Sequence, residues 1–202
     1  MKNWLKLVLA TAIISFGFAV SADEPTKKDP AEKVETKLAV GQKAPEFKIK
    51  DSAGKLIDLA ELTEKGPVLV RLTCGCSGCD KELAYFQELH EAYKSKGLIS
   101  LAVFKEPDTK VEDYVKAKKL NMLYAVDTKG ESWNVWQTKT MPTNFLIDKG
   151  GKIAAIAAGC DTTGLLAKKL SEKVADTVKS EAVDVKAAVD AKNKKEEKSQ
   201  GK

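Results

Sequence analysis

Arginine and histidine are almost missing from this chain of 202 residues, in which Arg71 is the only arginine and His90 the only histidine. Nucleic-acid-binding surfaces usually rely on arginine for bidentate contacts, so we expect no nucleic-acid partner. A single imidazole cannot complete a histidine-based catalytic or metal set. We therefore expect His90 to lie on or near a helix surface without a functional role. The formal net charge of +5 reflects lysine-rich solvated faces and a tail.

The apolar run at the N-terminus, from Leu7 to Val20, is short for a membrane-spanning helix. It follows two lysines and leads into a small-residue site, a pattern typical of a signal peptide cleaved after Ala22. No cysteine lies near that point, so a lipid anchor is not expected. We expect residues 1–22 to be a signal peptide and the mature chain to be periplasmic or secreted, without stable membrane insertion. An uncleaved membrane anchor is the alternative.

The rest of the chain divides by composition into a linker, one domain and a tail, which its length allows. Residues 23–37 are rich in lysine, glutamate, aspartate and proline, which indicates a disordered linker. Residues 38–178 carry the apolar patterns of a folded domain. Residues 179–202 form a Lys/Ala/Glu-rich tail, which we expect to be weakly helical at best and frayed by Lys192.

Within the domain, alternating apolar patterns predict strands and patterns of helical period predict helices. The expected strands are 47–50, 55–59, 68–72, 98–104, 122–126, 143–148 and 152–158, and the expected helices are 59–64, 80–96, 108–119, 130–137 and 161–178. This order predicts an α/β fold, in which a central mixed β-sheet is flanked by helices and preceded by an N-terminal β-hairpin. Trp133 and Trp136 are expected to contribute to packing rather than to a binding site.

Three of the four cysteines, Cys74, Cys76 and Cys79, lie within six positions of one another, between a buried strand and a helix. Thiol–disulfide exchange needs an exposed thiolate and a second thiol that resolves the mixed disulfide. Cys76 at the helix start would be the nucleophile, because the helix dipole favours its thiolate. Cys79, one turn later, would be the resolving thiol. The anions Asp80 and Glu82 oppose the dipole, so we expect only a moderately lowered pKa for Cys76.

Two further elements belong to the expected site. Met141-Pro142 precedes a strand, and we expect a cis peptide bond there, beside the disulfide, with the backbone of Met141 offered to an extended polypeptide. Cys160 ends the second strand of the terminal hairpin and should face the same end of the sheet as the other three cysteines. The four could form the disulfides 76–79 and 74–160 or relay electrons between pairs. An incidental thiol is the alternative for Cys74 and Cys160.

In this order and spacing, the motifs resemble the thioredoxin superfamily, and within it the exported TlpA/ResA-like branch with a redoxin-type (AhpC/TSA-type) N-terminus. The matching pieces are residues 40–47, the strand with the Cys76–Cys79 pair, and residues 141–153, and the likeness covers residues 38–175. It implies a thiol–disulfide oxidoreductase that needs no cofactor beyond a redox-active disulfide. Protein thiols and disulfides and a redox partner are the implied partners. Glu82 matches the family's glutamate and is expected to shuttle the proton of Cys79.

The chain departs from that pattern at three neighbouring positions. Gly75 replaces the tryptophan that precedes the first cysteine, so the disulfide would be less covered and Gly75 would border the substrate. Val70 replaces the buried acid of thioredoxins. Arg71 places a charge in a buried strand, where it would need to pair with a carboxylate near the site.

Three other readings of the cysteines stay open. One is a purely structural disulfide, which is common in exported proteins. Another is a peroxiredoxin-like peroxidase, because the spacing of Thr73 and Cys76 is similar in that family. However, Leu69 stands where that family has proline, and no arginine follows Arg71. The third is a soft-metal module in which the four cysteines hold zinc or copper(I) as thiolates.

Overall fold

The structure, a computed structural model, describes residues 37–200 of the chain. The expected signal peptide and nearly all of the expected linker lie outside the described residues. The elements are, in order, β1 (Lys48–Lys50), β2 (Leu56–Asp58), α1 (Leu59–Lys65), β3 (Val68–Thr73), α2 (Ser77–Tyr93), a 3-10 turn (Lys94–Lys96), β4 (Ile99–Phe104), α3 (Asp108–Lys118), β5 (Leu123–Val126), α4 (Glu131–Val135), β6 (Thr143–Ile147), β7 (Ile153–Ala158), α5 (Leu165–Val178) and α6 (Val185–Gln200).

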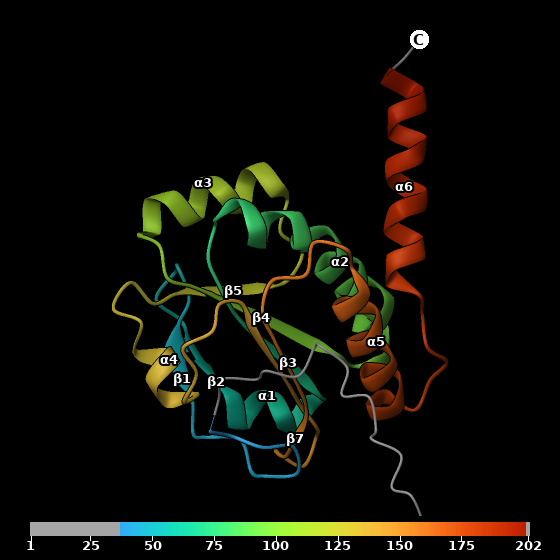
Figure 1. Cartoon of the computed structure of the whole chain (residues 1–202). Coiled ribbons are helices and arrows are strands. Elements are labelled where there is room, and N and C mark those ends of the chain that lie inside the picture. The colour runs from blue at the N-terminus through green and yellow to red at the C-terminus, as the bar shows by residue number, and fades with distance from the viewer. Residues whose placement is uncertain (1–36, 201–202) are drawn as a thin grey trace, which may run out of the picture. The chain divides into compact units, whose positions relative to one another are not determined.

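A five-stranded mixed sheet in the order β5-β4-β3-β6-β7 forms the centre of this unit (Figure 1). β3, β4 and β5 run parallel, while β6 pairs antiparallel with both β3 and β7. β1 and β2 form a separate antiparallel hairpin. The predicted fold class, a mixed sheet flanked by helices with an N-terminal hairpin, is therefore confirmed. All six residues of β3 are buried, as expected for the central strand of such a sheet.

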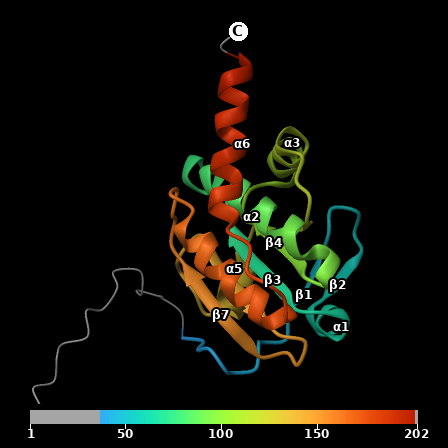
Figure 2. The same cartoon turned by 90° about the vertical axis from the view of Figure 1, so that its right-hand side faces the viewer.

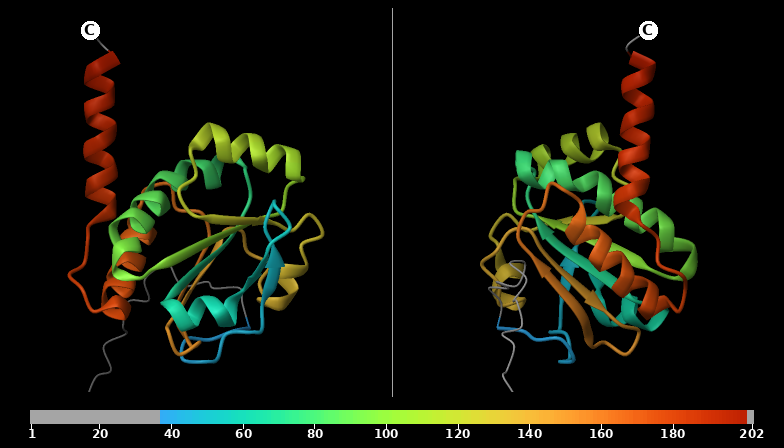
Figure 3. Two further views of the ribbon diagram at one scale, coloured as in Figure 1. Left: turned by 180° about the vertical axis from the view of Figure 1, so that it is seen from behind. Right: turned by 45° about the vertical axis from the view of Figure 1, so that its right-hand side comes forward.

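Alternate residues of the central strands divide the apolar core between the two faces of the sheet. Leu69 and Leu146 pack against α2 and α5, and α6 adds Val185 to this side. Val70 and Phe145 face the hairpin, α1 and α4, where Trp136 is completely buried. Figure 3 shows these two helical layers on opposite sides of the strands. Both tryptophans of this region belong to the core, as the sequence predicts.

The register of the sheet brings three distant segments to one end. Leu72, near the end of β3, lies opposite Thr143 at the start of β6. Thr143 in turn lies opposite Ala158, at the end of β7. Because Cys74 follows β3, Pro142 precedes β6 and Cys160 follows β7, all three residues lie at the same end of the sheet. The fold thus places the cysteines and the Met141-Pro142 bond together, although they are far apart in sequence.

The helices α2 and α5 begin at residues other than those that the sequence predicts. α2 begins at Ser77 rather than at position 80, so Cys79 lies inside the first turn. α5 begins at Leu165 rather than at position 161, because the Asp161 carboxylate accepts the backbone N–H groups of Thr163 and Leu166 and holds a loop there. Gly164 then precedes the helix at φ +80°, a conformation that glycine adopts without steric cost.

The expected fraying of the tail by Lys192 is wrong for the described residues, because α6 continues to Gln200. Its first turns bury Val185 and Val189 against α2 and α5, while residues 191–198 are exposed (Figure 2). Alanine, lysine and glutamate also have high helix propensity. Within residues 37–200, no helix is both long enough and apolar enough to cross a bilayer.

Candidate active site

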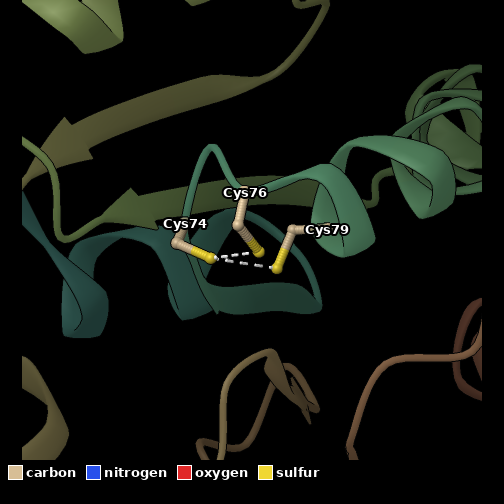
Figure 4. Close-up of side chains that lie close together, drawn as sticks. All are labelled: Cys74, Cys76 and Cys79. Atoms are coloured by element: carbon tan, nitrogen blue, oxygen red, sulfur yellow. Dashed lines mark hydrogen bonds between the residues drawn. The ribbon is translucent and has the colours of Figure 1, made fainter.

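The sulfur atoms of Cys74, Cys76 and Cys79 meet at the start of α2 (Figure 4). Cys74 lies in the loop after β3, Cys76 is the N-cap residue of α2, and Cys79 lies in its first turn. The Sγ of Cys74 lies 2.8 Å from that of Cys76 and 3.3 Å from that of Cys79. All three sulfurs lie within 4.8 Å of one another. The third thiol, Cys74, therefore contacts both members of the predicted pair.

The three thiols differ in exposure, and the pKa values of Cys74 and Cys76 are shifted in opposite directions. Cys76 is exposed, whereas Cys79 is buried with 3% of its surface accessible. The hydrogen bond that Cys74 donates lowers the pKa of Cys76, and the backbone N–H of Cys79 lowers it further. Burial raises the pKa of Cys74, which is the donor in that hydrogen bond. The direction expected for Cys76 from sequence is confirmed, and its largest cause is a neighbouring thiol.

Arg71 pairs with Glu82 beneath the cysteines. The two side chains are 3% and 1% exposed, and Nη2 of Arg71 lies 2.8 Å from Oε2 of Glu82. Arg71 also donates to Oδ1 of Asn144 at 3.0 Å and lies over the ring of Phe86. The expected pairing of Arg71 with a nearby carboxylate is confirmed. Such a pair persists in a core because each charge compensates the desolvation of the other.

Both carboxylate oxygens of Glu82 have a partner. Oε2 accepts from Arg71, and Oε1 accepts the backbone N–H of Asp161 from the loop after β7. Glu82 therefore connects α2 to the loop that carries Cys160. Its predicted part in moving the proton of Cys79 stays a prediction.

Cys160 lies beside the helix start, at the end of the sheet where the sequence places it. A Cβ atom on Gly78 would come within 3.0 Å of the Cys160 sulfur, so a side chain at position 78 would crowd that thiol. Burial is the largest cause that raises the pKa of Cys160, and the charge of Glu82 adds to it. All four cysteines are free thiols, and the 76–79 and 74–160 disulfides stay predictions.

The Met141-Pro142 peptide bond is cis, as predicted. Met141 is half-buried and Pro142 is buried, and the Pro142 carbonyl accepts the N–H of Gly159 at 2.9 Å, which ties it to the end of β7. The bond lies directly before Thr143, whose register partner, Leu72, lies two residues before Cys74. This placement suits the predicted role of Met141 and Pro142 in holding a substrate strand.

Sequence reasoning missed two residues that frame the cysteine loop. Glu106 accepts the backbone N–H of Gly75 at 2.7 Å, and Tyr114 of α3 lies on the same side of Gly75. Asp80, in the first turn of α2, pairs with Lys118 of α3. Glu106 follows β4, the parallel neighbour of β3, so its proximity could have been inferred from the shared carboxyl edge of the two strands.

Residues 40–156 match the model of the AhpC/TSA family. The thiol-disulfide oxidoreductase ResA of Bacillus thuringiensis subsp. konkukian is 35% identical over 68% of this chain and 80% of its own length. ResA of Geobacillus thermodenitrificans is 32% identical over 80% of this chain and 92% of its own.

Among solved structures, the thioredoxin domain of a thiol-disulfide oxidoreductase from Bacteroides vulgatus has a TM-score of 0.56 and 25% identity. That match covers 66% of this chain and 98% of the other. The expectation of a thioredoxin-like fold is confirmed.

Proposed function

Because this chain belongs to the AhpC/TSA family and is a thiol-disulfide oxidoreductase similar to ResA, we propose that it is exported and exchanges disulfides with protein substrates through Cys76 and Cys79. The observation that carries the proposal is the contrast between the two thiols. Cys76 is exposed at a helix N-terminus and has a lowered pKa, whereas Cys79 is buried in the first turn. An accessible nucleophile and a protected resolving thiol are what exchange requires.

In the reducing direction, the Cys76 thiolate attacks a substrate disulfide and forms a mixed disulfide, and one substrate sulfur leaves and takes up a proton. Cys79 then loses its proton and attacks Cys76, and the second substrate sulfur leaves as a thiol. Two electrons pass to the substrate, and the protein keeps a Cys76–Cys79 disulfide. In the oxidising direction, the same steps run in reverse.

The substrate would bind at the open edge beside Cys76. Gly75 has no side chain to cover the sulfur, and the backbone of Met141 at the cis bond to Pro142 would pair with an extended substrate segment. Glu82 would take part in moving the proton of Cys79. In this proposal Arg71 holds the carboxylate of Glu82 in position for that transfer.

Insulin reduction and substrate trapping test the exchange mechanism. Cys76→Ser should abolish the reduction of insulin disulfides. In Cys79→Ser the mixed disulfide should still be released in part, because Cys74 lies 2.8 Å from Cys76 and can attack in place of Cys79. The double variant Cys74→Ala/Cys79→Ser should therefore accumulate the trapped complex. The trapped complex should not form when Cys76 is replaced in addition to Cys74 and Cys79. It should still form when Cys160, and not Cys76, is the additional replacement. Equal activity of Cys76→Ser and the parent would refute the mechanism.

Export is tested by N-terminal sequencing of the protein from the extracytoplasmic fraction. A mature chain that begins at Asp23 is expected from the cleavage site after Ala22. Recovery of the full-length chain from the cytoplasm alone would contradict export.

A peroxidase is the second candidate, and the AhpC/TSA match is the observation that favours it. The guanidinium of Arg71, the only arginine, is engaged by Glu82 and Asn144 inside the core, so it does not reach a peroxide at Cys76. Consumption of hydrogen peroxide with a thiol donor should be slow beside insulin reduction. Rapid peroxide turnover without insulin reduction would favour the peroxidase.

A further inference from the structure

Thiol–disulfide exchange needs two cysteines of the protein, whereas the sulfur atoms of three cysteines meet at the start of α2. Cys74 is the central one, 2.8 Å from the sulfur of Cys76 and 3.3 Å from that of Cys79. We infer that Cys74, Cys76 and Cys79 in the reduced protein form a binding site for one Cu(I) ion, held by three thiolates. This inference goes beyond the proposed exchange with protein substrates and does not depend on it.

The spacing of the sulfurs suits an ion placed between them. A first-row metal lies about 2.3 Å from a thiolate sulfur, so three sulfurs around one ion in a plane are separated by about 4 Å. Two of the observed separations, 2.8 Å and 3.3 Å, are shorter than that value, and the third is at most 4.8 Å. The contact between Cys74 and Cys76 must open by about 1 Å, which side-chain rotation on a loop can supply.

The site is open on one side and protected on the other. Cys76 is exposed and Cys74 half-buried, while Cys79 is buried in the helix. Gly75 between the first two thiols is exposed and has no side chain to cover them. An ion can therefore enter from solvent beside Cys76 and leave by the same path.

The donor set selects the ion. Thiolates are soft ligands and favour Cu(I) and Zn²⁺ over hard cations. Structural zinc sites take four ligands, but within residues 37–200 the close cluster holds only the three cysteines. The fourth thiol, Cys160, lies beside Gly78 and is not part of the cluster. Because Cu(I) is satisfied by fewer soft ligands, the three-thiolate site fits Cu(I) better than zinc.

Binding changes protonation but transfers no electrons. Each of the three thiols releases its proton to solvent and forms a bond to the ion, so up to three protons leave for each Cu(I) bound. Cys76 and Cys79 can hold the ion only while they are not joined in a disulfide. The ion is thus an exchangeable ligand of the reduced form, which is compatible with the expectation that the chain has no resident cofactor.

The test is a titration of the reduced full chain with a Cu(I)–acetonitrile salt under anaerobic conditions, in competition with the chelator bicinchoninate. Cys74→Ala and the matched control Cys160→Ala are titrated beside the parent. The parent should bind one Cu(I) per chain, and Cys160→Ala should match it. Cys74→Ala should bind at least about 100-fold more weakly, since even outer-shell changes cost 10–100-fold in metal affinity. The diamide-oxidised parent should bind none.

X-ray absorption of the loaded parent provides a readout that does not depend on the folding of any variant, and it should show three sulfur neighbours around copper. Two sulfur neighbours, or equal affinity of the parent and Cys74→Ala, would overturn the three-thiolate site. Loss of binding in Cys160→Ala, or displacement of Cu(I) by equimolar Zn²⁺, would show a four-thiolate zinc site instead. Insulin reduction, measured in excess chelator, reports on the exchange mechanism separately, so failure of either proposal leaves the other standing.

Discussion

At the scale of single residues, Cys74 controls the charge of its neighbour. The pKa of Cys76 is lowered first by the hydrogen bond from Cys74 and next by the backbone N–H of Cys79. A thiol with a lowered pKa is ionised at lower pH. Alkylation of Cys76 by iodoacetamide in the reduced protein should therefore reach its half-maximal rate below about pH 8.5, the value for a free thiol.

Cys74→Ala removes the donor and should move that midpoint to higher pH. Mass spectrometry of the peptide that contains Cys76 measures the rate, and Cys160→Ala serves as the control that keeps the donor. A midpoint that is the same in Cys74→Ala and the parent would show that the helix N-terminus alone activates Cys76.

The buried pair of Arg71 and Glu82 gives a prediction of a different kind, for stability. Arg71→Met leaves the Glu82 carboxylate buried without a counter-charge, and Glu82→Gln leaves Arg71 in the same position. Each should lower the free energy of unfolding by about 3–5 kcal/mol. The double variant should cost clearly less than the sum, because no buried charge is left and the amide oxygen introduced by Glu82→Gln can still accept the N–H of Asp161.

Urea unfolding of the reduced protein measures these energies. The exposed pair of Lys94 and Glu91 is the matched control, and Lys94→Ala should cost no more than about 1 kcal/mol. Additive costs in the Arg71/Glu82 double variant would mean that the two charges do not stabilise one another.

The local sequence predicts part of this site but not all of it. The pattern Cys76-Ser77-Gly78-Cys79 before an amphipathic helix indicates the exchange pair without any tertiary information. A lone arginine in an apolar strand requires a carboxylate partner. Glu82 could be identified as the partner of Arg71 only once α2 was known to cover the face of β3 to which Arg71 points. The contact of Glu106 with Gly75 follows from the shared carboxyl edge of β3 and β4, so it could be inferred only once these strands were known to be parallel neighbours.

At the scale of elements, hydrophobic periodicity predicts the type of nearly every helix and strand, and capping decides the ends. α2 begins at Ser77 because Cys76 has extended backbone angles and serves as its N-cap, whereas serine and glycine have low helix propensity and shift the expected start. For α6, the sequence predicts less helix than the structure has. Its polar composition indicates fraying, but Val185 and Val189 provide an apolar anchor one turn apart, and the helix continues from it.

The packing of α2 on β4 makes His90 a reporter of pH. His90 is half-buried, and its Nδ1 lies 3.0 Å from the Ser100 hydroxyl of β4. Burial lowers the pKa of His90, and the charge of Lys94 lowers it further. Below its unfolded value of about 6.5, the unfolded chain binds a proton that the folded chain does not, so stability is lost as pH falls.

Because His90 is the only histidine, its ring protons can be followed by NMR without assignment. Their titration midpoint should lie below about 6.5 in the folded protein and return to the ordinary value in urea. His90→Gln has no imidazole to protonate, so it should lose less stability than the parent as pH falls. Its free energy of unfolding relative to the parent should therefore rise as pH is lowered from about 6.5 to about 5. A midpoint at or above the ordinary value would contradict the burial argument.

At the scale of the whole described unit, the segment before β1 pairs with the start of β7. The N–H of Gly41 donates to the carbonyl of Ile153, and the N–H of Ile153 donates to the carbonyl of Gln42, so this segment extends the edge at β7. Composition places a domain start near residue 38, but it does not show which strand this segment joins. Register between distant segments is set by tertiary packing, which a local pattern does not encode.

Phe47 is the apolar anchor of that segment and yields the last prediction. Its ring centroid lies 5.6 Å from that of Trp136, which in turn lies 4.6 Å from that of Phe145 in β6. Phe47→Ala should therefore lower the free energy of unfolding by about 3–5 kcal/mol, measured by tryptophan fluorescence in urea. The control Val40→Ala, at a position 62% exposed, should change it by less than about 0.5 kcal/mol.

If the unit unfolds cooperatively, the buried Cys79 should become open to alkylation at the same urea concentration, and that concentration should fall in Phe47→Ala. Cys79 that reacts before the fluorescence changes would show that the cysteine end opens independently of the aromatic core.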